Sequence, residues 1–382
     1  MDDDDFTDIL ASVREFVRTR VVPLEEQIEA ADRIPDELIA ESKQMGLFGL
    51  AIPEEYGGIG LDALQDVRLA MELGYTTPAY RSLFGTNNGI AGQVLVNYGT
   101  EEQKQQWLPR LASGEVIASF ALTEDGAGSD PSGMRTAAVK DGDTYLITGS
   151  KRFITNAQLA QVLVVFARTN PNASGTKGIS AFLVDTDSPG LTIGPHDKKM
   201  GQEGAWTSEL FFDDVVVGTD RLIGGKEEVG FHAAMASLAK GRLHISAICV
   251  GQAQRILDES VRHAATATQG GKPIGTFQLI QGMIGESYAE LRAARALALE
   301  AAHEFRDGTD RKLGPSASKL FASEMLGRVA DRGVQIHGGM GYMRTVPVER
   351  FYRAARLFRI YEGTSEVQKL VLARQLLKAE GL

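Results

Sequence analysis

The sequence predicts an α+β protein in three consecutive parts. They are an N-terminal helical domain over residues 1–115, a middle antiparallel β-sheet domain over 116–224 and a C-terminal four-helix bundle over 225–382. Apolar residues recur at spacings of three and four in the first and last parts, which is the period of one helix face. In the middle part, short β-branched segments follow one another without intervening helices, which argues against a parallel dinucleotide-binding sheet.

The first part begins with a helix whose apolar face consists of Phe6, Ile9, Leu10, Val13, Phe16, Val17 and Val21. Pro35 starts a second helix and Gly46 ends it. Further helices are expected over residues 61–74 and 90–98. Thr100 and Gln103 fit a capping box at the start of the next helix.

Strands and long helices follow in order. Strands are expected over residues 116–121, 145–148, 162–167, 179–184 and 209–217, and helices over 229–268, 277–305, 315–337 and 365–378. Helices this long need partners along their whole length. The bundle is therefore expected to pack against other subunits as well.

Composition and charge restrict the partners and the compartment. A formal net charge of -10 disfavours a nucleic acid or an anionic membrane as partner, because phosphate groups would repel the protein. Cys249 is the single cysteine and lies in an apolar helical pattern, which favours core packing and a reducing, cytoplasmic compartment. Met1 and the acidic residues after it precede no basic segment, so no secretory signal is expected, and no apolar stretch has the length of a membrane span. The histidines lack the spacing of metal ligands, and no hydrolase or nucleotide-phosphate motif occurs.

Glu362 is the strongest candidate for a catalytic group. It precedes a turn into a helix, where Ser365 and Gln368 fit a capping box. An acidic residue at this place can simply complement the helix dipole, which lowers the carboxyl pKa. Tyr361 and the apolar run before it would instead withdraw the carboxylate from water and raise its pKa toward a value useful for a general base. On these residues alone, both interpretations stay open.

Three other segments combine glycine turns with polar residues: 122–130 after a strand, 149–156 in the next strand region and 335–342 at the end of a helix. Taken singly, such turns are common for purely conformational reasons, and Gly338 with Gly339 fits a helix C-cap.

Taken together and in this order, from about residue 52 to residue 368, these segments resemble the signature motifs of the acyl-CoA dehydrogenases. That family has the same order of helical, sheet and bundle domains. The resemblance implies an FAD-dependent oxidoreductase that acts on a CH–CH bond and converts an acyl-CoA thioester to a trans-2-enoyl-CoA. In the family a glutamate removes the proton α to the thioester while the β hydrogen leaves as hydride to the flavin. Glu362 would be that base.

The resemblance also implies the cofactor contacts: Phe120, Leu122, Thr123, Gly128, Ser129, Phe153, Ile154, Thr155, Ile274, Phe277, Gln278, Gln335, Gly338, Gly339, Thr364 and Glu366. The family usually has Trp at Phe153, and Phe keeps the flat apolar face while losing the indole donor. The segment around Gly338 is expected to receive the adenine end of FAD from a neighbouring subunit. Ala267 and Gly270 stand where the family has Arg and Phe, which removes a pyrophosphate partner.

The substrate contacts implied by the resemblance are Ser129, Arg242, Gly363 and Arg81. Some related enzymes take their catalytic base from the position that Gly241 occupies here. Glycine has no side chain to serve as a base, so Glu362 is the one candidate that the resemblance implies. The family's acidic residue in that helix is replaced by Ala239, which leaves Arg242 as the CoA contact, although an Arg inside a long helix more often forms an ion pair.

Arg81 suggests the class of substrate. Its run, Tyr80, Arg81 and Ser82, resembles the Tyr-Arg-Ser of glutaryl-CoA dehydrogenase, whose Arg meets the distal carboxylate of the substrate. A short acyl-CoA with a terminal anionic group is therefore predicted, with Glu72 holding the guanidinium in place. Without the resemblance, a surface or inter-helix role is the commoner one for an isolated Arg.

The resemblance further implies an electron-transferring flavoprotein as acceptor, a homo-oligomer (a tetramer or dimer of dimers) and a role in fatty acid metabolism. The alternatives are an acyl-CoA oxidase or desulfinase of the same fold, or a non-catalytic acyl-CoA or flavin-binding module. Glu362 argues against a desulfinase, and the missing Arg at Ala267 is the one feature that favours a binding module.

Overall fold

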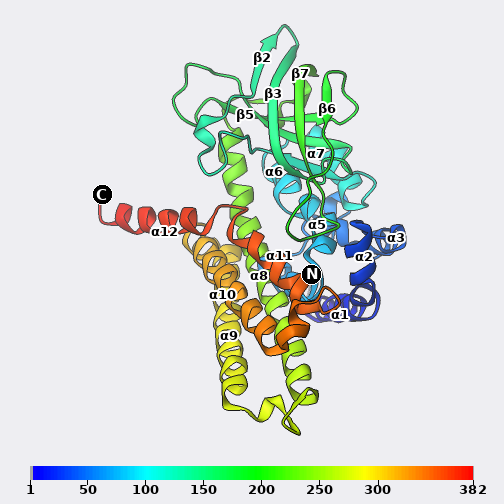
Figure 1. Ribbon diagram of the computed structural model, residues 1–382. Helices are drawn as coiled ribbons and strands as arrows, with labels where there is room; N and C mark the ends of the chain where they lie inside the picture. The colour runs from blue at the N-terminus through cyan, green and yellow to red at the C-terminus, as the bar shows by residue number, and fades with distance from the viewer. Residues whose placement is uncertain (1–2, 382) are drawn as a thin grey trace.

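The computed structural model describes residues 3–381 and contains the three predicted parts: N-terminal helices, a β-sheet and C-terminal helices (Figure 1). Met1 and Asp2, the start of the acidic N-terminal run, lie outside the described residues. The domain boundaries after residues 115 and 224 stay predictions. Helix α7 ends at Ala112, shortly before the first boundary, and a short turn of helix, η7 (Ile223–Gly225), spans the second boundary.

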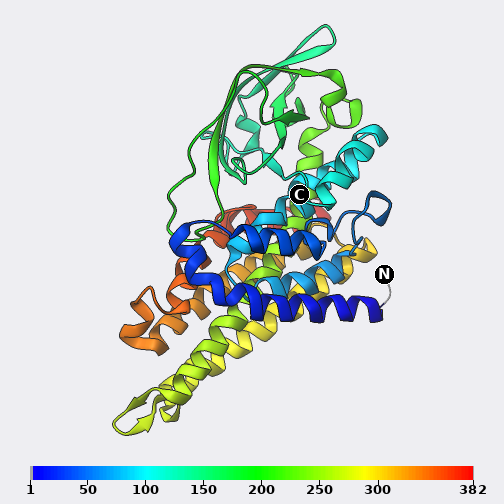
Figure 2. The ribbon, with the colours of Figure 1, turned by 90° about the vertical axis from the view of Figure 1, so that its right-hand side faces the viewer.

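The N-terminal helices are α1 (Asp3–Phe16), α2 (Glu25–Ala31), α3 (Asp36–Gln44), α4 (Ala63–Leu73), α5 (Pro78–Asn88), α6 (Ile90–Tyr98) and α7 (Glu101–Ala112). The capping box of α7 is confirmed: Gln103 N donates to Thr100 Oγ1 at 3.3 Å, and Thr100 N donates to Gln103 Oε1 at 3.0 Å. Helix α5 was not predicted, although Thr77 caps it and Pro78 occupies its first turn. These helices lie below the sheet and beside the long C-terminal helices (Figure 2).

The sheet contains β1 (Ala118–Ala121), β2 (Ala137–Asp141), β3 (Thr144–Thr155), β4 (Val162–Arg168), β5 (Ile179–Asp185), β6 (Leu191–Ile193) and β7 (Thr207–Gly218). Its order is β1-β4-β2-β3-β7-β6, with β5 paired to β4. The prediction of a wholly antiparallel sheet is corrected at β4. Strand β1 runs parallel to β4, and β2 also pairs with β4 in parallel, through a single residue pair. The β2–β3 hairpin lies between β1 and β4 in the chain, and a connection this long can return the chain in the same direction. Strands β2 and β6 were not predicted.

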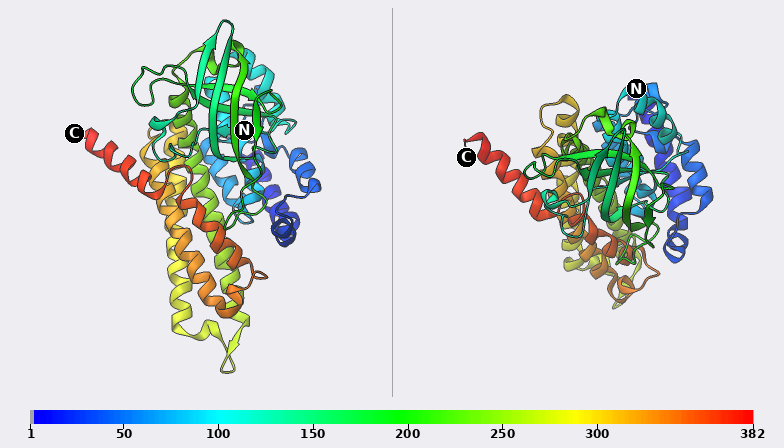
Figure 3. Two further views of the ribbon diagram at one scale, coloured as in Figure 1. Left: turned by 45° about the horizontal axis from the view of Figure 1, so that its top comes forward. Right: turned by 90° about the horizontal axis from the view of Figure 1, so that it is seen from above.

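The C-terminal helices are α8 (Gly230–Thr266), α9 (Gln278–Asp307), α10 (Leu313–His337), α11 (Pro347–Ala355) and α12 (Ser365–Ala379). Helices α8, α9 and α10 pack together, and α4 also packs against α8 and α9. The predicted fourth bundle helix, α12, instead contacts mainly α10 and extends away from the others (Figures 1 and 3). Its Leu370, Leu376 and Leu377 are each at least half exposed, so residues 3–381 of one chain offer these side chains no core to enter.

Helix α8 crosses the junction of the three parts. Near its start, Ala233 and Ala234 belong to a core shared with α6, α7 and one face of the sheet. From Leu243 onward, α8 belongs to a second core shared with the N-terminal helices, α9 and α10. Residues between these two points therefore adjoin all three parts. Within residues 3–381, no helix is long and apolar enough to cross a membrane.

Candidate active site

Glu362 lies in the turn between η10 (Arg356–Arg359) and α12. Its φ angle is 52°, and that of Gly363 is 90°. The left-handed region suits glycine, but for glutamate it is an uncommon, strained conformation that surrounding contacts must maintain. The turn thus gives the carboxylate an orientation that neither a helix nor a strand would give.

The helix after the turn is capped by Thr364, which corrects the predicted capping box of Ser365 and Gln368. The Thr364 hydroxyl accepts a hydrogen bond from Val367 N. Gln368 Nε2 instead donates to the carbonyl oxygens of Glu362 and Gly363, at 3.2 and 3.0 Å. These carbonyl groups precede the helix and accept no hydrogen bond from its backbone N–H groups. The Gln368 side chain is their donor instead.

Two residues of α10 that the sequence did not indicate hold the turn in place. Lys319 is fully buried, and its Nζ donates to Gly363 O at 2.7 Å. Glu324 accepts hydrogen bonds from Ser365 Oγ at 2.5 Å and from Arg359 Nη1 at 3.3 Å, so it joins the two sides of the turn. No local pattern could identify either residue, because charged residues in helices are usually exposed.

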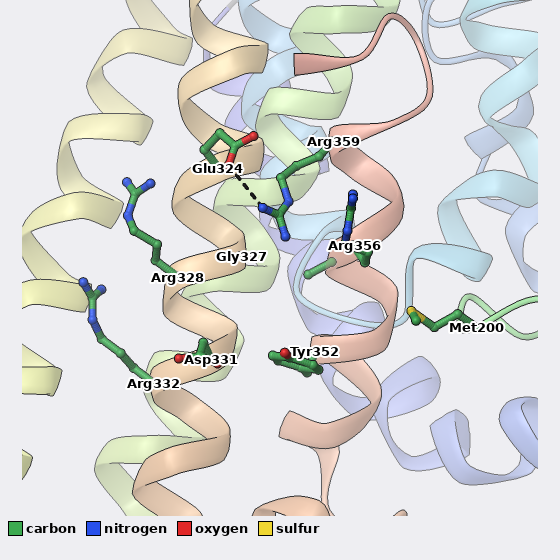
Figure 4. A pocket seen from close by; sticks show the side chains of 10 residues that line it. Met200, Glu324, Gly327, Arg328, Asp331, Arg332, Tyr352, Arg356 and Arg359 are labelled. Carbon is green, nitrogen blue, oxygen red and sulfur yellow. Dashed lines mark hydrogen bonds and ion pairs between the residues drawn. The ribbon is translucent and has the colours of Figure 1, made fainter. Parts of the chain in front are cut away.

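Figure 4 shows the Glu324–Arg359 pair at a pocket between α10 and α11. Arg328 and Arg332 also line this pocket, and both form ion pairs with Glu290 on α9. Glu362 is not among the lining residues. The pocket is therefore separate from the carboxylate, and its arginines are largely compensated.

The carboxylate of Glu362 lies in a poorly solvated place. Its Oε2 atom is buried and has no hydrogen-bond partner among residues 3–381. Burial raises the pKa of Glu362 above its ordinary value, and the charges of Arg81, Lys319 and Arg242 oppose this shift without cancelling it. The sequence left open whether the helix dipole lowers the pKa of Glu362 or burial raises it, and the structure favours the raised pKa.

Gly241 on α8 makes the space for that carboxylate. A Cβ atom at Gly241 would lie 2.3 Å from Glu362 Oε2 and 3.2 Å from Ile90 Cγ2. The position that serves some related enzymes as the source of the base therefore adjoins the carboxylate of Glu362. Next to it, Arg242 Nη1 donates to Ser316 Oγ at 3.4 Å and Nε lies 3.5 Å from Glu362 O. Arg242 thus lies at the site and forms no ion pair within residues 3–381.

The two strand signatures form one surface. Lys151 and Glu124 make a buried ion pair of 2.8 Å, and Arg152 N donates to Thr123 O at 2.8 Å. Glu124 also accepts hydrogen bonds from the backbone N–H groups of residues 135 and 136, which fixes the glycine-rich loop. Burial lowers the pKa of Lys151 to about 8. The polar residues of both motifs therefore hold this surface together, and Phe153 is the exposed apolar side chain on it.

Phe153 shows that this surface fits the flat ring system of a flavin. The ring is 60% exposed, although Phe153 has a φ of 58°, a strained conformation for an aromatic residue. The Arg152 guanidinium lies 4.4 Å from the ring centroid and supports one face. Ile154 beside it is buried and Thr155 half-buried, as is Thr123 on the facing segment. An exposed ring held in a strained conformation is suited to stacking on a flat ligand.

The remaining predicted flavin-ring contacts come from β1 and the loop after it. Phe120 and Leu122 are almost buried, whereas Gly128 and Ser129 are exposed in the loop. Asn156, at the end of β3, donates to Ser82 O at 2.8 Å and so ties this surface to α5. Thr364 and Glu366 lie at the start of α12, next to Glu362.

The other predicted cofactor contacts lie elsewhere. Ile274, Phe277 and Gln278 follow the hairpin of β8 (Thr268–Gln269) and β9 (Lys272–Pro273), at the end of α8 opposite the sheet (Figure 1). Gln335, Gly338 and Gly339 are exposed at the end of α10. From Gly241 to the end of α8 is roughly 38 Å at 1.5 Å per residue. One chain therefore does not bring the two groups of predicted contacts together.

Arg81 is held by a residue other than the predicted one. Glu72 forms ion pairs with Arg14 and Arg18, at 2.8 and 2.9 Å, because it faces α1 and the turn after it. Arg81 Nε donates instead to His244 Nδ1 at 2.9 Å. Arg81 exerts the largest of the charge effects that lower the pKa of Glu362, so it lies within electrostatic reach of the carboxylate. Among residues 3–381, no cluster of His, Cys, Asp and Glu could hold a metal ion.

Three family models match the chain: acyl-CoA dehydrogenase, N-terminal domain over residues 3–115, middle domain over 119–215 and C-terminal domain over 228–377. The chain is 39% identical over 365 residues to an acyl-CoA dehydrogenase of Bacillus subtilis (strain 168), covering 96% of each protein. It is also 39% identical over 353 residues to the caffeyl-CoA reductase-Etf complex subunit CarC of Acetobacterium woodii, covering 92% of this chain and 93% of that one. The structure of butyryl-CoA dehydrogenase from Megasphaera elsdenii matches with a TM-score of 0.94 and 34% identity, covering 99% of this chain and 100% of that one.

Proposed function

The chain belongs to the acyl-CoA dehydrogenase family of FAD-dependent oxidoreductases that act on the CH–CH group, and we propose that Glu362 is its catalytic base. Glu362 removes the proton α to the thioester of an acyl-CoA, and the product is a trans-2-enoyl-CoA. One observation carries this proposal: Glu362 is half-buried with its Oε2 atom buried, and within residues 3–381 that atom has no hydrogen-bond partner. Burial also raises the pKa of Glu362. A base in this state is ready to accept a proton from a substrate.

The surrounding residues orient and enclose the base. Lys319 and Gln368 fix the two carbonyls of the turn, and Gly241 leaves room for the carboxylate. Phe153 and its neighbours on the two strand signatures hold the isoalloxazine ring. When bound, FAD supplies the acceptor for the hydrogen that leaves the β-carbon. Arg242 contacts the CoA part of the substrate, with Ser129 and Gly363 nearer the thioester.

The proposal is tested by mixing the protein anaerobically with acyl-CoA thioesters and following the bleaching of the flavin. Bleaching separates an enzyme from a binding module, and consumption of O₂ separates an oxidase from a dehydrogenase. An electron-transferring flavoprotein is the proposed acceptor, supported by the relative that is a subunit of a reductase-Etf complex. That relative also favours the reverse reaction as a second candidate. In that direction Glu362 would return the proton to the enoyl-CoA as a general acid.

Gly241→Ala is expected to lower kcat by about 10²-fold, because misplacing a catalytic group by 1 Å can have an effect of this size. The new Cβ atom would need the space that Glu362 Oε2 occupies. Gly282→Ala is the matched control, since no described residue has an atom within 4 Å of a Cβ atom at that position. Steady-state dye reduction measures both variants. Equal turnover in the two would show that Glu362 can perform its role from another position.

A homo-oligomer, a tetramer or dimer of dimers, is proposed because one chain separates the two groups of predicted FAD contacts. In the oligomer, the segment around Gly338 of one copy receives the adenine end of the flavin held by another, and the segment around Phe277 makes the other contact between subunits. We further propose that the substrate is a short acyl-CoA with a terminal anionic group that Arg81 contacts.

The purified protein is expected to be yellow and to hold FAD noncovalently, with partial occupancy because Ala267 and Gly270 stand where the family has Arg and Phe. Ala267→Arg is expected to raise FAD affinity about tenfold or more, the size of a hydrogen bond to a charged group. Extraction, mass analysis and equilibrium dialysis measure cofactor identity and affinity. A colourless protein that takes up no FAD would contradict the proposal, and an unchanged affinity would place Ala267 away from the pyrophosphate.

A further inference from the structure

Arg81 has a neutral hydrogen-bond partner, although it lies close to a catalytic carboxylate. Its Nε donates to Nδ1 of His244, which is therefore the acceptor atom. An imidazole that accepts at Nδ1 is neutral and carries its proton at Nε2. The partner thus fixes the orientation of the guanidinium without compensating its charge.

The rest of the guanidinium is available to a ligand. Within residues 3–381, His244 is its only hydrogen-bond partner, so neither Nη atom is engaged. The carboxylate that could have neutralised Arg81, Glu72, is already shared by Arg14 and Arg18. A planar donor group with two free Nη atoms matches the geometry of a carboxylate.

Gly85, one turn after Arg81 on α5, restricts the plane of the guanidinium. A Cβ atom at Gly85 would lie 2.9 Å from both Cζ and Nε of Arg81. The guanidinium is therefore packed flat against the backbone on one side and hydrogen-bonded to His244 at its Nε edge. The two contacts together determine where the Nη atoms are.

His244 is itself held by charged residues behind it. It is buried on α8, and its Nε2 lies 3.7 Å from Oδ1 of Asp66 on α4. Asp66 is buried, and its other oxygen lies 3.9 Å from Nζ of Lys240. The aspartate attracts the Nε2–H side of the ring, so Nδ1 is turned toward Arg81. Burial raises the pKa of Asp66, and the charges of Lys240 and then Arg81 oppose this shift, yet among residues 3–381 Asp66 forms no ion pair with Arg81.

His244 also lies on the same side of α8 as the base pocket. It follows Gly241 by three residues, and residues at this spacing share one helix face. Gly241 is the residue that adjoins Glu362 Oε2. The guanidinium positioned by His244 therefore lies on the same side of α8 as the base.

We propose that His244, oriented by Asp66, positions Arg81 as the receptor for a terminal carboxylate on the acyl chain, and so determines specificity. This inference rests on the proposed anionic substrate class. His244 is a positioning residue: it acts through Arg81 and contacts neither the base nor the substrate.

The test compares glutaryl-CoA with hexanoyl-CoA on the FAD-loaded protein. His244→Leu removes the acceptor, and kcat/KM for glutaryl-CoA is expected to fall about tenfold more than that for hexanoyl-CoA. His244→Asn places an amide oxygen near the position of Nδ1 and is expected to restore most of the preference. The same substitutions in an Arg81→Met background are expected to change the preference no further, because His244 then has nothing to position.

The outcomes separate the two proposals. If the wild type bleaches with both thioesters but does not prefer glutaryl-CoA, the anionic substrate class fails, and this inference fails with it. A second outcome is that the wild type prefers glutaryl-CoA, but His244→Leu lowers kcat/KM equally for both thioesters or for neither. The role of His244 is then overturned while the substrate class stands. A further loss of preference in the Arg81→Met background would also overturn it. If His244→Leu does not fold, His244→Gln, which displaces the acceptor, takes its place in the comparison.

Discussion

Glu362→Gln is expected to lower kcat for flavin reduction by about 10² to 10⁴-fold, the usual contribution of a general base. The amide keeps the size and shape of the side chain but cannot accept the α-proton. Binding of FAD and of acyl-CoA is expected to remain, so the loss appears in the chemical step and not in affinity. Rapid mixing of the FAD-loaded variant with substrate measures that step directly. Normal bleaching would show that Glu362 is only a charge near a helix end.

The pH dependence of wild-type kcat is a second test of Glu362 as the base. Glu362 has a raised pKa, so it becomes protonated and inactive as the pH falls through that raised value. The acid limb of wild-type kcat is therefore expected above the ordinary range of a glutamate. A profile flat down to the ordinary glutamate pKa would contradict the burial of the base.

The effect on stability has the opposite sign to the effect on activity. A carboxyl group with a raised pKa in the folded state stabilises the fold at pH below its unfolded pKa, and this contribution is lost as the pH rises through the folded value. At pH above its raised folded pKa, the ionised Glu362 therefore costs stability. The Tm of Glu362→Gln is expected to be no lower than that of the wild type, which thermal unfolding of both proteins at neutral pH would check.

Arg81→Met is expected to lower kcat/KM for glutaryl-CoA by about 10² to 10⁴-fold relative to butyryl-CoA and hexanoyl-CoA. The guanidinium and a substrate carboxylate can form two charge-assisted hydrogen bonds, each worth about 1.5 to 3 kcal/mol. The uncharged thioesters lose no such contact. Arg14→Met is the matched control, because it removes the same charge from α1, where Arg14 forms an ion pair with Glu72.

Arg81→Met has a second effect that must be separated from the first. Arg81 lowers the pKa of Glu362, so its removal raises that pKa further. The acid limb is then expected to move to higher pH for every substrate, and the comparison belongs at a pH well above it. The anionic substrate class would be refuted if the wild type preferred the uncharged thioesters. It would also be refuted if Arg81→Met lowered kcat/KM equally for glutaryl-CoA, butyryl-CoA and hexanoyl-CoA.

Much of the fold could be predicted because its signals are local. The predicted helix 90–98 coincides with α6, and the capping box of Thr100 and Gln103 is present at the start of α7. Periodicity and caps act within a few residues, so a single sequence carries them. Strand β2 and helix α11 were missed, and α12 leaves the bundle because the apolar face seen in its sequence meets no partner within one chain.

The sequence by itself determined the order of the three parts, the turn that carries Glu362 and the family to which the chain belongs. The tertiary structure alone decided the state of the base and the partner of Arg81. Burial of Glu362 depends on Gly241, and the opposing charges come from Arg81 and Lys319. These residues lie on three other helices, separated from Glu362 by 43 to 281 positions in the numbering. A pKa depends on distance in space and on solvent access, and a contact between distant segments exists only once the helices have packed.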